Sequence, residues 1–126
     1  MLFGRAVVYL MGAFYVLAGI SHFTQPGFFR QIVPPALPAP ALLVVLSGVA
    51  EIVLGVLVVV PATRRMAAWG IIALLIAVWP ANFYQALYNP MLVDPPAWMG
   101  QPTQTALWIR LPLQLVLMYW AWRYTR

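Results

Sequence analysis

The residues best equipped for chemistry lie inside segments that are otherwise apolar. A carboxylate, Glu51, interrupts the run "ALLVVLSGVAEIVLGVLVVV" at 41–60, which holds no other charge. The other candidates are an imidazole, a guanidinium and four side chains that carry an amide or a hydroxyl: His22, Arg110, Ser47, Asn82, Gln85 and Gln114. An ionised group at the centre of a bilayer costs from about 3 to more than about 10 kcal/mol. We therefore expect these side chains to face one another or a wet cavity, where they can hydrogen-bond or hold a polar ligand.

The composition indicates that lipid surrounds most of the chain. Of its 126 residues, 64% are apolar and 7% are charged, whereas charged residues make up about a quarter of a typical soluble domain. So few charges cannot cover a surface in water. This predicts a multi-pass protein of the cell (inner) membrane, with the lipid bilayer as its first partner. The net charge of +5 comes from arginines that are spread over the segment ends. Nucleic-acid binding is therefore not expected.

The side chains that are missing exclude several chemistries. The chain has no cysteine, which excludes disulfides, thiol redox chemistry, iron–sulfur ligation and thiolate zinc sites. A single His cannot supply two axial ligands to a haem. We find no carboxylate pair, glycine-rich phosphate loop, serine elbow or metal-ligand spacing. No catalytic residue, metal site or cofactor is therefore assigned, and an enzyme is the less favoured interpretation.

Four apolar segments approach the roughly 20 residues that a helix needs to cross a bilayer. They lie at 5–23, 41–60, 66–88 and 105–122. We predict one all-α domain over 1–126, a four-helix transmembrane bundle. Between the first two spans, "PGFFRQIV" predicts a short interfacial helix that begins at Pro26 and ends before Pro34.

The placement of the arginines predicts the orientation of the bundle. Most of them flank one side of the predicted spans: Arg5, Arg64, Arg65, Arg123 and Arg126. The loops on the other side hold Arg30 and Asp94. Both termini are therefore expected to be cytoplasmic, and the two longer proline-rich loops are expected to face outward.

The depth of each polar residue follows from the helical rise of 1.5 Å per residue. Glu51 lies about 15 Å into its span, Arg110 about 8 Å and Asn82 about 9 Å below the outer surface. Gln114 is one turn deeper than Arg110, Gln85 is near Asn82, and His22 ends the first span. All four helices thus bring a polar group to the outer half of the membrane.

Small residues and prolines support a shared site in that half. Ser47, Glu51 and Gly55 share one helix face, and Gly12, Gly19 and His22 share another. Pro80 and Pro112 each leave a backbone carbonyl of their helix without its usual donor. We predict a bundle that opens outward around Glu51, Asn82, Arg110 and Gln114. Three alternatives stay open: Glu51 and Arg110 as a purely structural pair, a different face assignment, and an oligomer interface.

Four motifs carry a family resemblance: "HF" followed by a proline after the first span, "SG-x-x-E-x-x-LG", "PAN" and "RLPLQ". Through them the chain resembles the DoxX-like family of small four-helix membrane proteins over nearly its whole length. The family name is similar to that of a subunit of an archaeal thiosulfate:quinone oxidoreductase. The resemblance therefore implies a four-helix bundle associated with a membrane redox system.

These observations lead to two expected functions. The first is an accessory component of a membrane redox system that binds a lipophilic molecule, such as a quinone head group, in the polar pocket. Arg110, Asn82 and Gln114 would then donate hydrogen bonds to its carbonyl oxygens. The alternative is an assembly or stabilising factor for membrane proteins, whose buried polar cluster is structural. An independent enzyme or transporter, a redox or other membrane-protein partner, and a homo-oligomer stay open.

Overall fold

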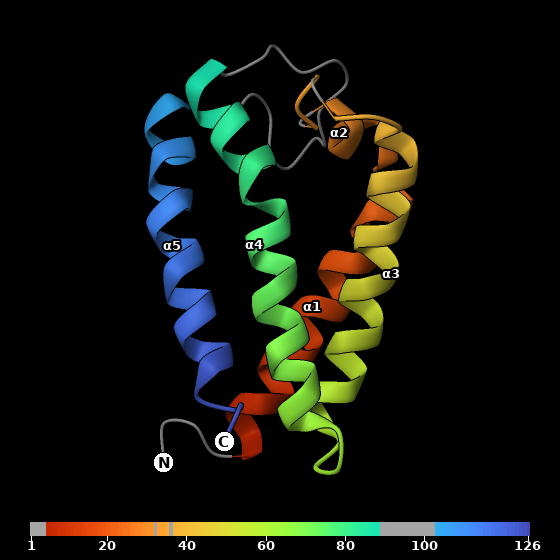
Figure 1. Ribbon diagram of the computed structural model, residues 1–126, viewed down its shortest axis with the longest axis vertical. Helices are drawn as coiled ribbons and strands as arrows, with labels where there is room; N and C mark the ends of the chain where they lie inside the picture. Colours follow the sequence, from red (N-terminus) through yellow and green to blue (C-terminus); the bar gives the residue numbers. More distant parts are fainter. Residues whose placement is uncertain (1–4, 32, 36, 89–102) are drawn as a thin grey trace.

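In the part of the chain that the structure describes, four long helices form a bundle and one short helix lies across its end (Figure 1). The computed structural model describes residues 5–31, 33–35, 37–88 and 103–126, and these ranges contain helices and connections but no strand. The helices are α1 (Arg5–Thr24), α2 (Pro26–Gln31), α3 (Pro40–Val59), α4 (Arg64–Tyr88) and α5 (Gln104–Trp122). Each long helix begins and ends within two residues of its predicted bounds, and α2 begins at Pro26 as predicted. Asp94 lies outside the described residues.

The number of helices that qualify as membrane spans is lower than expected. Within the described residues, three helices rather than four are long and apolar enough to cross a membrane: Ala6–Thr24, Pro40–Val59 and Arg64–Tyr88. The nineteen residues of α5 include Gln104, Arg110 and Gln114. These polar side chains bond to α4 and lower the apolar content of α5. α5 nevertheless runs beside α4 along the bundle (Figure 1).

α1 and α3 form an antiparallel pair whose backbones touch. A Cβ atom added at Gly19 would lie 2.6 Å from the carbonyl oxygen of Gly48, and one added at Gly55 would lie 2.8 Å from that of Gly12. Contacts this short leave no room for a side chain at any of the four positions. Glycine therefore sets the separation of the two helices, as small residues do at close crossings in membranes.

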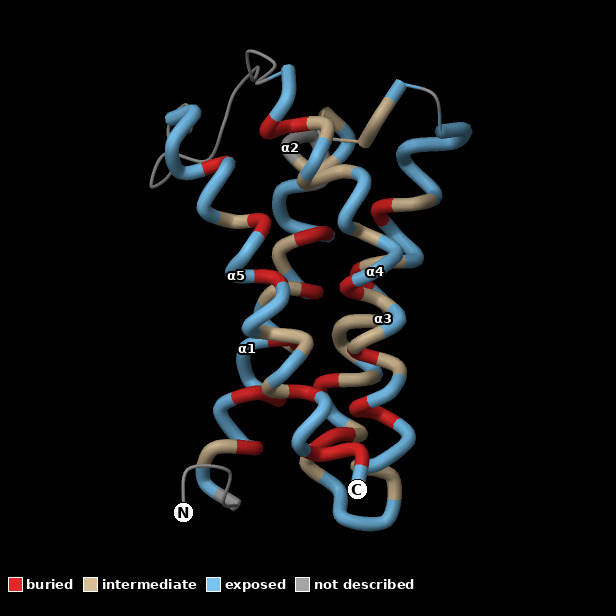
Figure 2. Tube along the Cα trace, turned by 60° about the vertical axis from the view of Figure 1, so that its left-hand side comes forward, coloured by how far each residue is buried: buried red, intermediate tan, exposed pale blue. Residues whose placement is uncertain are grey.

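The two helix pairs, α1–α3 and α4–α5, are joined mainly at one end of the bundle. We call it the terminal end, because α1 begins and α5 ends there, and the opposite end the α2 end (Figure 1). Buried positions recur on all the long helices (Figure 2). The main buried cluster lies at the terminal end and consists of Val8, Met11, Tyr15, Val58, Ala67, Ala68, Ile71, Leu75, Ala121 and Tyr124. A smaller cluster of Ala86, Leu107 and Leu111 joins α4 to α5 alone.

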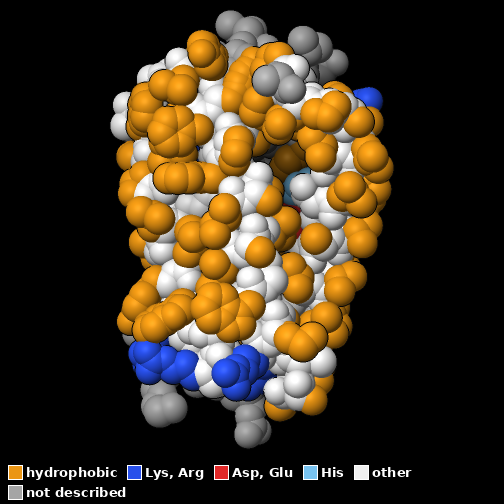
Figure 3. Space-filling model, in the orientation of Figure 1, with side chains coloured by type: hydrophobic (Ala, Val, Ile, Leu, Met, Phe, Trp, Pro, Cys, Tyr) orange, Lys and Arg blue, Asp and Glu red, His pale blue; other side chains and the backbone are white. Residues whose placement is uncertain are grey.

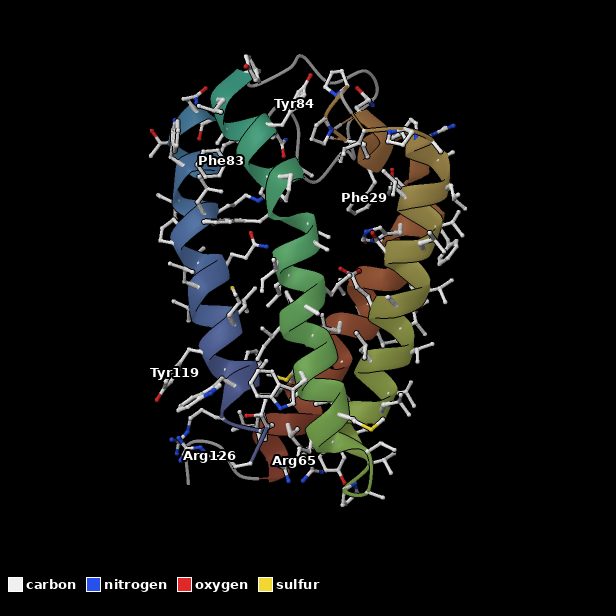
Figure 4. The ribbon with its side chains drawn as sticks, viewed as in Figure 1. Phe29, Arg65, Phe83, Tyr84, Tyr119 and Arg126 are labelled. Carbon is white, nitrogen blue, oxygen red and sulfur yellow. The ribbon has the colours of Figure 1, made fainter. Side chains whose placement is uncertain are left out.

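The turn between α3 and α4 satisfies the backbone at the terminal end. Arg64 donates from Nε to the carbonyl oxygen of Val58 at 2.8 Å and from Nη2 to that of Val59 at 3.0 Å. Thr63 Oγ1 donates to the carbonyl oxygen of Leu57 at 2.7 Å. The last carbonyls of a helix lack helical donors, so these side chains complete α3. Arg65 and Arg126 lie at the same end (Figure 4).

The glycine contacts generate a first prediction. Gly19→Ala would place a methyl group against backbone that cannot move independently, and such overpacking costs about 1–3 kcal/mol. We expect a lower free energy of unfolding in detergent, measured by denaturant titration. Gly70→Ala is the matched control, because its Cβ would meet the movable tip of Leu54 at 2.6 Å. An equal loss in both variants would contradict the assignment of Gly19 as a backbone contact.

Candidate functional site

A cavity of about 450 Å³ lies between the two helix pairs, toward the α2 end. The cavity borders the main buried cluster of the terminal end. Tyr15 and Leu75 belong to that cluster and also line the cavity. Most of its wall is apolar, with polar side chains contributed by α1, α3, α4 and α5. Its volume is in the range of small-molecule sites, about 300–1,000 Å³.

The cavity is visible as a hollow on the side of the molecule, between α3 and α4 (Figure 3). Pale-blue and red atoms, the colours of His and of Asp or Glu, are visible inside this hollow, and hydrophobic side chains surround it. Phe29 extends from α2 toward the bundle and lines the cavity at its α2 end (Figure 4). Polar groups are therefore reached through an apolar rim.

The wall formed by α4 and α5 carries a continuous hydrogen-bond network. Arg110 donates from Nη2 to Asn82 Oδ1 at 2.9 Å and from Nη1 to Gln85 Oε1 at 2.9 Å. Asn82 Nδ2 donates to Gln114 Oε1 at 2.7 Å. Successive bonds that run in one direction polarise one another. We call these four residues the α4–α5 network.

The network ends on the backbone near a proline. Gln114 Nε2 donates to the carbonyl oxygen of Leu75 at 2.6 Å. Pro80 lies inside α4 and cannot donate to the carbonyl of Ile76, the next residue. A proline opens the helix at this point, which lets a side chain from another helix reach its carbonyls.

The opposite wall, formed by α1 and α3, holds the acidic group. Glu51 Oε2 lies 3.3 Å from His22 Nδ1, and Nδ1 also lies 2.8 Å from the carbonyl oxygen of Ala18. The His22 ring stacks on Phe29 of α2, with 3.9 Å between ring centroids and 15° between planes. The imidazole is therefore fixed in place by α1, α2 and α3 together. Tyr15, His22, Ser47 and Glu51 are the polar residues of what we call the α1–α3 wall.

Most of the residues selected from the sequence meet at this cavity. Six of the seven line it: His22, Ser47, Glu51, Asn82, Arg110 and Gln114. Gln85 is buried and supports Arg110 instead. Within the described residues, Glu51 and Arg110 form no ion pair with each other. Glu51 contacts His22, while Arg110 bonds to amides of α4.

One polar residue of the cavity was missed by sequence reasoning. Tyr15 is 2% exposed and lines the cavity from α1, and its hydroxyl has no hydrogen-bond partner among the described residues. The sequence did hold a signal for Tyr15: it lies seven residues before His22, and residues seven apart share a helix face. Among the described residues there is also no group of three or more His, Cys, Asp or Glu side chains that could hold a metal ion.

These features define a class: an all-α protein compatible with a membrane, with a polar-walled cavity between two helix pairs. Within this class, the chain belongs to the family described as "Domain of unknown function (DUF8561)", which matches residues 11–125. No curated protein and no solved structure matches the chain.

The resemblance to the DoxX-like family is wrong, because the family that matches is a different one. The structure explains why the motifs misled. "SG-x-x-E-x-x-LG" holds Gly48 and Gly55, which any close helix crossing requires. "PAN" and "RLPLQ" hold Asn82, Arg110 and Gln114, which are joined by hydrogen bonds. Close packing and paired polar groups are requirements of helical bundles in general, so these motifs do not define one family.

The α4–α5 network generates a second prediction. Asn82→Leu and Gln114→Leu remove the two partners of one hydrogen bond, so their effects on the free energy of unfolding should couple by about 0.5–2 kcal/mol. A double-mutant cycle in mixed detergent micelles measures this coupling. Thr63→Val is the control partner for Asn82→Leu, because Thr63 bonds to Leu57 at the far end of the bundle. The effects of Asn82→Leu and Thr63→Val on the free energy of unfolding should therefore add. If the effects of Asn82→Leu and Gln114→Leu on the free energy of unfolding simply add, the hydrogen bond between these residues is contradicted.

Proposed function

We propose that this protein binds a lipophilic small molecule, with the polar head of the ligand in the cavity and its apolar part toward the bilayer. The single observation that carries the proposal is the cavity itself, which combines a mostly apolar wall with polar groups from four helices. Apolar pockets with a few convergent polar groups are typical of ligand sites. Its side opening between α3 and α4 (Figure 3) suits a ligand that arrives from lipid.

A head group with a carbonyl oxygen, as in a quinone, is one candidate for this site. A guanidinium has five N–H groups, and the hydrogen bonds of Arg110 to Gln85 and Asn82 use two of them. The remaining donors could serve a carbonyl oxygen. The association with a redox system rested on the DoxX-like resemblance, so a redox partner is not part of the proposal.

A second candidate function is an assembly or stabilising factor for membrane proteins. The observation that favours it is the α4–α5 network, whose members bond to one another and to the backbone without any ligand. Interhelical hydrogen bonds of this kind hold membrane helices together. In that case the polar cluster serves the bundle alone.

We also propose that α5 crosses the membrane as a fourth span, with both termini cytoplasmic. Two observations support this topology. α5 lies beside α4, which presents polar partners to Gln104, Arg110 and Gln114. Arg65 and Arg126 lie at the terminal end (Figure 4), and arginines favour the cytoplasmic side.

The topology gives a third prediction, which the absence of cysteine makes simple to test. Thr103→Cys, just before α5, should react with a membrane-impermeant thiol reagent added to intact cells. Ala62→Cys and Arg126→Cys, both at the terminal end, should react only after the cells are opened. Labelling of Arg126→Cys and Thr103→Cys from the same side would mean that α5 does not cross.

The proposed ligand gives a fourth prediction. Ala81→Trp should fill the cavity, because Ala81 lines it. Ala73→Trp adds the same side chain at an exposed position of α4 that does not line the cavity. Native mass spectrometry and extraction of the purified protein should find a bound lipophile in the wild type and in Ala73→Trp, and lose it in Ala81→Trp.

The two candidate functions differ in this experiment. If Ala81→Trp retains the same lipids as the wild type and Ala73→Trp, phospholipids included, ligand binding in the cavity is contradicted and the structural role is favoured. The thermal unfolding of each variant is measured in parallel, so that misfolding is not mistaken for loss of binding.

A further inference from the structure

The two walls of the cavity differ in which hydrogen bonds they leave unmet. On the α4–α5 wall, the side-chain oxygens of Asn82 and Gln114 already accept hydrogen bonds from within the network. What this wall still offers is the positive charge and the remaining N–H groups of Arg110. It can therefore receive a hydrogen-bond acceptor.

The α1–α3 wall instead holds buried oxygen atoms that lack a hydrogen-bond partner in the described part of the chain and can accept a hydrogen bond. Glu51 Oε2 is a buried atom that takes part in no hydrogen bond with the described residues, although it lies 3.3 Å from His22 Nδ1. The Tyr15 hydroxyl is also buried without a partner in this part of the chain. Buried polar atoms in native proteins nearly always have a partner, so each exception calls for one.

The His22 ring adds a further acceptor to this wall. Its Nδ1 faces two oxygens, at 2.8 Å in Ala18 and 3.3 Å in Glu51, which assigns the hydrogen to Nδ1. In a neutral ring with that tautomer, Nε2 accepts hydrogen bonds. Stacking on Phe29 keeps the ring in this orientation.

The packing of α1 on α3 places these groups at neighbouring levels. Gly12 is opposite Gly55, and Gly19 is opposite Gly48. Because the helices are antiparallel, Tyr15 on α1 and Glu51 on α3 come close to the same level between the two glycine contacts. Both residues line the cavity.

We propose that the ligand is an amphiphile whose head group donates a hydrogen bond through an O–H or N–H group to Glu51 and Tyr15, and carries an acceptor that faces Arg110. This inference rests on the proposed function and adds the chemical class of the ligand. Glu51 and Tyr15 are then the residues that determine specificity. Two sources share this chemistry: a phenolic lipid such as an alkyl hydroquinone, and a phospholipid with a primary ammonium head.

The experiment compares pairs of probes in which methylation removes the hydrogen-bond donor. The first pair is decyl hydroquinone and its dimethyl ether, and the second is short-chain phosphatidylethanolamine and phosphatidylcholine. Dissociation constants are measured by isothermal titration calorimetry on the full chain in detergent. The hydroquinone is kept reduced by dithionite, to which a chain without cysteine offers no thiol or disulfide.

We expect the donor-bearing member of at least one pair to bind about tenfold or more tightly than its methylated partner, since a hydrogen bond to a charged or buried acceptor is worth about that factor. The pair that shows the difference identifies the source. Tyr15→Phe keeps the ring and should reduce the difference, as should Glu51→Gln. Tyr9→Phe is the matched control, because Tyr9 is an exposed tyrosine of the same helix, and it should leave the difference unchanged.

The remaining outcomes overturn the inference in two distinguishable ways. If methylated and unmethylated probes bind equally, and Ala81→Trp abolishes both, the cavity binds lipophiles and only the donor requirement is wrong. If no probe binds to the wild type while native mass spectrometry still finds a lipophile that Ala81→Trp loses, only the inference fails. If Ala81→Trp leaves binding unchanged, the proposed function fails and the inference fails with it. If the donor-bearing probe still binds more tightly than its methylated partner in both Tyr15→Phe and Glu51→Gln, its donor bonds to another residue. This result also overturns the inference.

Discussion

The backbone contact between α1 and α3 is the constraint on which the rest of the structure depends. Glycines at 12, 19, 48 and 55 let the two helices approach until a Cβ would meet a carbonyl oxygen. α4 and α5 are joined differently, by side-chain hydrogen bonds and a small apolar cluster. Because the large cluster that unites the two pairs lies at the terminal end, space is left between them toward the α2 end, and that space is the cavity.

The cavity separates the acidic group, Glu51, from the partly buried Arg110. Arg110 is held by amides of α4, whereas Glu51 has His22 as its neighbour. Had Glu51 and Arg110 bonded directly to each other, neither ionisable group would be left to bind a ligand in the cavity. Separated, they give its two walls opposite hydrogen-bonding character. Such unmet polar atoms cost stability, and this cost supports the proposal that a ligand occupies the cavity.

Motifs in apolar helices are a weak guide to family. The residues that suggested a DoxX-like protein are those that packing and polar pairing require, and the family shown by comparison is another. Gly48 and Gly55 are needed wherever two helices touch. Asn82 and Gln114 are needed wherever buried amides must find partners. Both requirements come from the apolar surroundings and recur in unrelated bundles.

The sequence by itself determined the helices and the general region of the site. Segment length, with Pro26 and Pro34, predicts helix bounds to within two residues. Helical rise brings His22, Glu51, Asn82 and Arg110 to the same half of the membrane. Only the tertiary structure decided which of them pair and that Tyr15 joins them. Pairing depends on how each helix is rotated about its axis, and that rotation is set by contacts between helices, such as those of the glycines, which spacing along one helix does not specify.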